Sequence, residues 1–72
     1  MNKIEKQNVI NALVTRCIDE MRKVGNDNVP AHKAILDRYE MQIKPLGLTR
    51  TDFMVQIGYK TGALKNYREI YG

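Results

Sequence analysis

Apolar residues recur at helical spacing along the first third of the chain. They repeat in steps of three and four, which places them on one side of a helix, and they are Ile10, Leu13, Val14, Cys17, Ile18 and Met21. Gly25 follows this stripe, and Arg22 and Lys23 suit the negative end of a helix dipole. The pattern predicts a long amphipathic helix over about residues 3–24.

A turn separates this helix from a second one. Residues 26–30 read NDNVP, a composition that favours turns, and Pro30 suits the first position of a helix. A second apolar stripe follows, formed by Ala31, Ile35, Leu36, Tyr39 and Ile43. Pro45 and Gly47 then interrupt the pattern, so we expect a helix over about residues 30–43, with His32 exposed in its first turn.

A third helix is indicated from Thr49 onward. Thr49 is a suitable N-cap, and Asp52 three residues later gives an imperfect capping box. Phe53 and Ile57 are apolar positions one helical turn apart. This helix is expected to end at about Ile57.

The residues after Ile57 complete the pattern of a helix-turn-helix over about residues 49–69. Gly58 stands where a sharp turn needs a residue without a Cβ, and Leu64 and Tyr67 are three apart on a following helix. No segment alternates as a strand does. We therefore expect an all-α fold of four to five helices, in a single domain that spans residues 1–72.

Charge and length narrow the function. The chain has 72 residues and a net charge of +4, and residues 30–72 carry seven Lys or Arg against four Asp or Glu. The positive excess therefore lies with the helix-turn-helix half, as nucleic-acid binding requires. A chain this short has a small core, so a partner or a second copy is an expected source of further stability.

Residue types argue against enzymes and metal sites. The sequence has no serine, a single cysteine (Cys17) on the apolar stripe and a single histidine (His32). We expect Cys17 to be a buried structural thiol, and we expect no catalytic residue, no cofactor, no bound metal and no small-molecule substrate. A lone cysteine and the lack of a signal peptide or transmembrane segment favour a cytoplasmic protein without membrane contact.

Residues 48–67 resemble the helix-turn-helix of the phage repressor and Cro superfamily. The matching positions are Phe53, Ile57, Gly58, Tyr59, Leu64 and Tyr67. This resemblance implies direct binding of operator DNA by a dimer, and the DNA-binding candidates are Arg50, Thr51, Lys60, Thr61, Lys65 and Asn66.

Two departures from that superfamily favour another use of the motif. Met54 replaces the usual alanine where the two helices approach, and Gly62 occupies a leading position of the recognition helix, where it reads no base. Small residues and tyrosines suit protein interfaces instead. The candidates for binding a protein partner are Val55, Tyr59, Lys60, Thr61, Gly62, Ala63, Asn66 and Tyr67.

Length, charge and this altered motif together resemble the modulators of repression of temperate lactococcal phages. Those small antirepressors bind the phage repressor and interfere with its operator binding in the switch between lysogenic and lytic growth. The resemblance implies that this chain acts in the cytoplasm of a bacterial host cell and binds the N-terminal helix-turn-helix domain of a phage repressor, with DNA contacted directly or through that complex. Cro-like DNA binding is the alternative, and a helical scaffold protein with an accidental likeness is the third interpretation.

Overall fold

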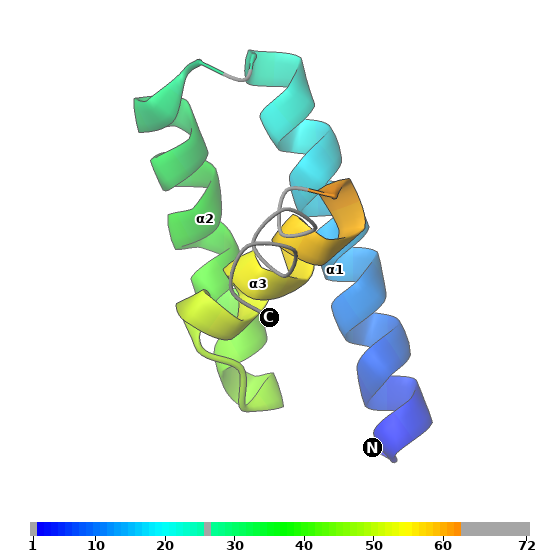
Figure 1. The fold of residues 1–72 in the computed structure, drawn as a ribbon. Helices are drawn as coiled ribbons and strands as arrows, with labels where there is room; N and C mark the ends of the chain where they lie inside the picture. Colours follow the sequence, from blue (N-terminus) through cyan, green and yellow to red (C-terminus); the bar gives the residue numbers. More distant parts are fainter. Residues whose placement is uncertain (1, 26, 63–72) are drawn as a thin grey trace, which may run out of the picture.

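Helices form every element of the part of the protein that the structure describes. The computed structural model describes residues 2–25 and 27–62. The elements are α1 (Lys3–Val24), α2 (Val29–Ile43), a short 3-10 helix η1 (Lys44–Leu46) and α3 (Arg50–Thr61). Figure 1 shows α1 and α2 joined by a short turn as a hairpin, with α3 across one side of this pair. The all-α class is thereby confirmed.

Polar side chains and glycines set the ends of α1 and α2. The Asn2 side chain accepts a hydrogen bond from the Glu5 backbone N–H at 2.8 Å, and Gly25 closes α1 with a φ of 90°. The Asn28 side chain accepts from the Ala31 N–H at 3.3 Å, and Pro30 occupies the first turn of α2. These caps satisfy backbone groups that have no partner within the helix. The two helices lie where their apolar stripes predict them.

The expected turn at Gly58 is wrong. Helix α3 begins with the predicted capping box of Thr49 and Asp52, but it continues through Gly58 and ends at Thr61. Gly58 is buried, and the residue that turns left-handed is Gly62, with a φ of 83°. The cost of a glycine within a helix is about 1 kcal/mol, and the burial of Ile57 and Phe53 in the same helix exceeds it.

The expected fourth helix cannot be compared with the structure. The sequence predicts this helix from about Thr61 to Glu69 or Tyr71, and of that range only Thr61 and Gly62 are described. The candidate residues Ala63, Lys65, Asn66 and Tyr67 therefore lie outside the described residues. The described chain holds three α-helices, and the second helix of the motif stays a prediction.

One apolar core joins the three helices. Its members come from α1, α2 and α3 and are Ile10, Leu13, Val14, Cys17, Ile18, Ile35, Tyr39, Ile43, Phe53 and Ile57. Tyr39 and Phe53 stack with their ring centroids 5.9 Å apart, which joins α2 to α3. Cys17 is fully buried, and burial raises the pKa of its thiol to about 11, so it is protonated at neutral pH.

His32 differs from its expected role as an exposed residue. Its side chain is partly buried, and Nε2 lies 2.8 Å from the carbonyl oxygen of Gly25, across the turn between α1 and α2. The imidazole N–H donates to that carbonyl, so His32 helps to close the hairpin. The sequence pattern did not indicate this contact because it depends on how the turn folds back.

Candidate interaction surface

Apolar side chains are exposed along one side of α3. Thr51, Val55, Tyr59 and Gly62 follow one another at steps of three and four and are all exposed; we call them the outer face of α3. Val55 is 40% exposed and Tyr59 is 52% exposed. Buried positions of the same helix, Phe53 and Ile57, point to the core. The outer face therefore adds apolar area to the surface of a helix that is already anchored.

Arg50, a candidate for binding DNA, is held within the protein. Its guanidinium forms salt bridges with Asp37 and, at 3.4 Å, with Glu40, and it lies 3.5 Å from the carbonyl oxygen of Lys33. These contacts hold the pKa of the Asp37 carboxyl below its usual range and raise that of Arg50. The side chain is 29% exposed, so Arg50 fixes the start of α3 to α2.

Lys60, which was a candidate for both kinds of partner, lies on another side of α3. Its ammonium donates a hydrogen bond to the Thr15 hydroxyl of α1 at 2.8 Å. Gln56, Tyr59 and Lys60 also line a cleft with Gln7 and Asn11 of α1. Lys60 thus bridges α3 to α1, and it borders the same cleft as Tyr59, whereas Val55 does not line that cleft.

Thr61, also a candidate for both partners, belongs to the inner side of α3. Its hydroxyl donates to the Ile57 carbonyl at 2.9 Å, which supports the last helical turn. Of the protein-binding candidates within the described chain, the structure therefore brings together Val55, Tyr59 and Gly62. Of the DNA-binding candidates, Arg50 and Thr51 stand at one end of α3, and Lys60 and Thr61 at the other, about 15 Å along the helix.

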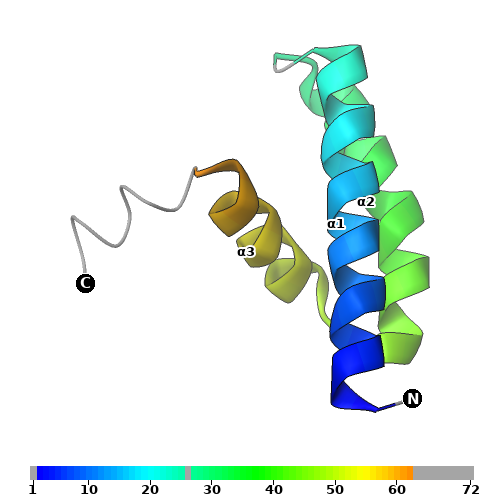
Figure 2. The ribbon, with the colours of Figure 1, turned by 90° about the vertical axis from the view of Figure 1, so that its right-hand side faces the viewer.

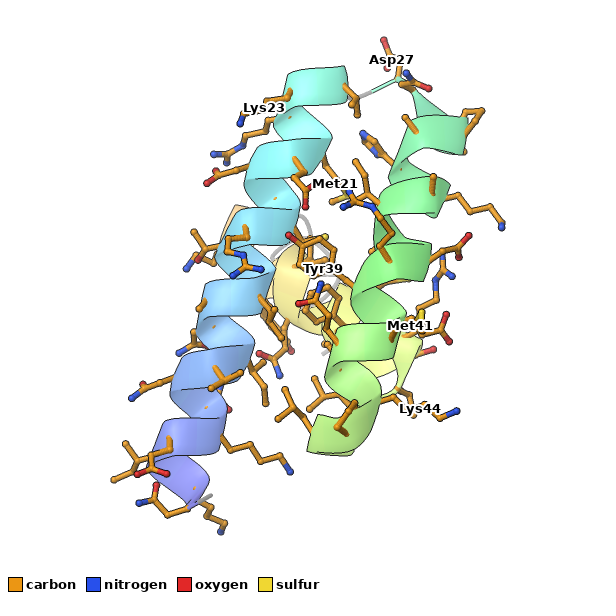
Figure 3. All side chains as sticks on the ribbon, turned by 180° about the vertical axis from the view of Figure 1, so that it is seen from behind. Met21, Lys23, Asp27, Tyr39, Met41 and Lys44 are labelled. Atoms are coloured by element: carbon orange, nitrogen blue, oxygen red, sulfur yellow. The ribbon has the colours of Figure 1, made fainter. Side chains whose placement is uncertain are left out.

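A polar cluster on the opposite side of the molecule was not indicated by the sequence. Glu20 of α1 accepts hydrogen bonds from Arg38 at 2.6 Å and from the Tyr39 hydroxyl at 2.5 Å, both on α2. Figure 3 shows Tyr39 between the two helices. Arg38 and Tyr39 hold the pKa of Glu20 below its usual value, and burial raises the pKa of Tyr39. These hydrogen bonds join α1 to α2.

The described residues contain neither a metal-binding cluster nor a membrane-spanning helix. Within residues 2–25 and 27–62, no group of three or more His, Cys, Asp or Glu side chains is placed to hold a metal ion. None of the described helices combines the length and apolar character needed to cross a bilayer. Comparison of the chain with models of protein families, with curated proteins and with solved structures gave no match.

Proposed function

We propose that this protein regulates transcription by binding another DNA-binding protein through the outer face of α3. The observation that carries this proposal is the exposure of Val55 and Tyr59 on a helix whose core residues are fully packed. Half-exposed aliphatic and aromatic side chains on a rigid helix suit the centre of a protein interface.

The resemblance to phage antirepressors suggests the partner. The proposed partner is the N-terminal helix-turn-helix domain of a phage repressor, and a protein seated on its recognition helix excludes DNA by occupying the same surface. In this proposal the protein needs no catalysis and no cofactor. The helix-turn-helix character of the chain itself is part of the proposal, with α3 as the first helix and Gly62, the left-handed residue, as the start of the turn.

The contacts that Arg50 and Lys60 already make within the protein favour this function over Cro-like binding of DNA. The Arg50 guanidinium forms salt bridges with Asp37 and Glu40, and the Lys60 ammonium donates a hydrogen bond to the Thr15 hydroxyl. Direct phosphate contact by Arg50 requires the loss of its salt bridges to α2. The basic balance of residues 30–72 supports the alternative, which the same experiment tests.

A gel-shift titration on the promoter region of a candidate repressor tests the proposal. We expect this protein alone to shift no DNA and to remove or alter the shift that the repressor produces. Val55→Glu places a charge in the centre of the outer face and is expected to weaken repressor binding at least about tenfold. The matched control is Met41→Glu, because Met41 is 79% exposed and belongs to α2 and not to the outer face of α3.

Circular dichroism of both variants establishes that they fold. Equal repressor binding by wild type and a folded Val55→Glu variant contradicts the proposed interface. A specific shift by this protein alone, falling steeply with salt, indicates the Cro-like function instead.

A further inference from the structure

A groove opens between α3 and the hairpin of α1 and α2. Figure 2 shows that α3 diverges from the α1–α2 pair toward its C-terminal end. The groove has a volume of about 360 Å³, and its lining includes Met21, His32, Leu36, Met54, Ile57 and Thr61. It adjoins a cavity of about 230 Å³ that shares Met21, His32 and Thr61 and reaches Arg22 near the end of α1.

The walls of this groove are mainly apolar and adaptable. Met21 and Leu36 are partly buried against the core, and Met54 is 49% exposed at the rim. Methionine side chains are flexible and polarisable, and they are common on surfaces that receive helices of varied sequence. The volume is that of a small ligand cleft, sufficient for the large apolar side chains that anchor a bound helix.

The charge at the rim has one sign. Among the described residues that line either cavity, none is acidic, and Arg22 carries a positive charge. Arg22 forms no salt bridge within the described part of the chain. Asp37 follows Leu36 on α2, but its carboxylate is paired with Lys33 and Arg50. The groove therefore presents an apolar floor beside a cation, Arg22, that forms no salt bridge with the described residues.

We propose that this groove is the docking site for an acidic amphipathic helix of a partner protein. An apolar side chain of that helix enters between Met21 and Met54, and a carboxylate one turn away pairs with Arg22. The site is distinct from the outer face of α3, because Val55 and Tyr59 are rotated about 100–140° from Met54 around the helix. The protein thus carries two interaction surfaces, and the second does not rest on the function proposed for the first.

The methionines allow a direct test with the full chain. Methionine methyl groups are labelled with ¹³C, and the protein is titrated with a synthetic helical peptide that has leucines on one side and glutamates on the other. We expect the signals of Met21 and Met54 to shift, whereas that of Met41, on the far side of α2 from α1, stays in place (Figure 3). A second peptide with lysine in place of each glutamate is expected to bind at least about tenfold more weakly.

Charge reversal on α1 completes the test. Arg22→Glu is expected to weaken binding of the acidic peptide at least about tenfold. The matched control, Lys23→Glu, makes the same change in net charge one residue away, where Lys23 lines the polar cleft on the opposite side of the hairpin. Val55→Glu is expected to leave peptide binding unchanged, which separates this site from the repressor-binding surface.

Several results overturn the proposal. They are the absence of a shift at Met21 and Met54, equal binding of the two peptides, and a shift of Met41 as large as the others. Signals that move with protein concentration alone assign the groove to a second copy of the chain. Signals of Met21 and Met54 that move in a Leu64→Lys variant without peptide assign it to the chain's own residues, and either assignment replaces the proposed partner.

Discussion

The two ends of α3 differ in the groups that they present to the rest of the molecule and to solvent. At its start, Thr49 and Asp52 form a reciprocal cap, Arg50 pairs with Asp37 and Glu40, and Phe53 stacks on Tyr39. Toward its end, Val55 and Tyr59 are exposed, and the groove beside Met54 opens. Ile57 is buried in this half too, so the helix is anchored along its length and differs between its ends in what the other sides present: paired polar groups at the start and apolar surface toward the end. Substitutions at the start should therefore reduce stability, whereas those on the outer face should reduce binding.

Removal of the Phe53 ring should have the largest effect. Phe53 is 1% exposed and links α3 to α2, so Phe53→Ala is expected to cost about 3–5 kcal/mol of unfolding free energy. Urea unfolding followed by circular dichroism measures the loss. Met41→Ala, at a side chain 79% exposed, is the control and should unfold at the wild-type midpoint. A similar midpoint for Phe53→Ala would show that α3 is not anchored through this ring.

Loss of the N-cap should have an intermediate effect. The Thr49 hydroxyl accepts from the Asp52 N–H at 3.1 Å, and Thr49→Ala leaves that donor without its partner. The expected cost is about 0.5–2 kcal/mol. Thr51→Ala removes an exposed hydroxyl in the same helical turn and serves as the control in the same urea measurement. Equal costs for the two variants would contradict the importance of the cap.

Acidic pH should weaken the salt bridge between Asp37 and Arg50 at the start of α3. The pKa of Asp37 is lowered from its usual 3.8, chiefly by the hydrogen bond from Arg50, so its charged form stabilises the fold above that value. This stabilisation is lost as the pH falls through the lowered pKa. Asp37→Asn should thus be less stable than wild type at pH 6, and the gap should narrow as the pH drops below 3.8. Urea midpoints at pH 6 and pH 2 measure it, and a constant gap would exclude the carboxylate charge as its cause.

The smallest effect on stability is expected at the outer face. Val55 is 40% exposed, and alanine is a better helix former, so Val55→Ala should change the unfolding free energy by less than about 0.5 kcal/mol. The same variant should bind the repressor domain more weakly in the gel-shift titration. A large loss of stability would mean that Val55 belongs to the core, and the comparison between the two ends of α3 would fail.

Much of the helical framework could be predicted from local pattern. The apolar spacing from Ile10 to Met21 places one side of α1 in the core, and Pro30 lies in the first turn of α2. The capping box at Thr49 was also predicted, because it depends on two residues three positions apart. Gly58 was interpreted wrongly, since a glycine that ends a helix and a glycine buried within one look alike in a sequence.

The contacts around the candidate surface could not be predicted in the same way. The sequence made Arg50 a candidate for binding DNA, and only the path of α3 across α2 brings it to Asp37 and Glu40. Lys60 meets Thr15 across 45 positions of the chain, and Glu20 meets Tyr39 across 19. None of these pairs leaves a local signal, because each depends on the rotation and register of two helices.

Local sequence patterns were enough to predict the all-α class, the bounds of α1 and α2 and the capping box at the start of α3, because these follow from interactions within a few residues. It also determined the basic balance of residues 30–72. The packing of the helices was needed to show that Arg50 is salt-bridged and Lys60 hydrogen-bonded, which apolar residues of α3 remain exposed and where the groove lies. These properties arise when three helices pack against one another, since burial of Phe53 and Ile57 fixes the rotation of α3 and thereby turns Val55 and Tyr59 outward.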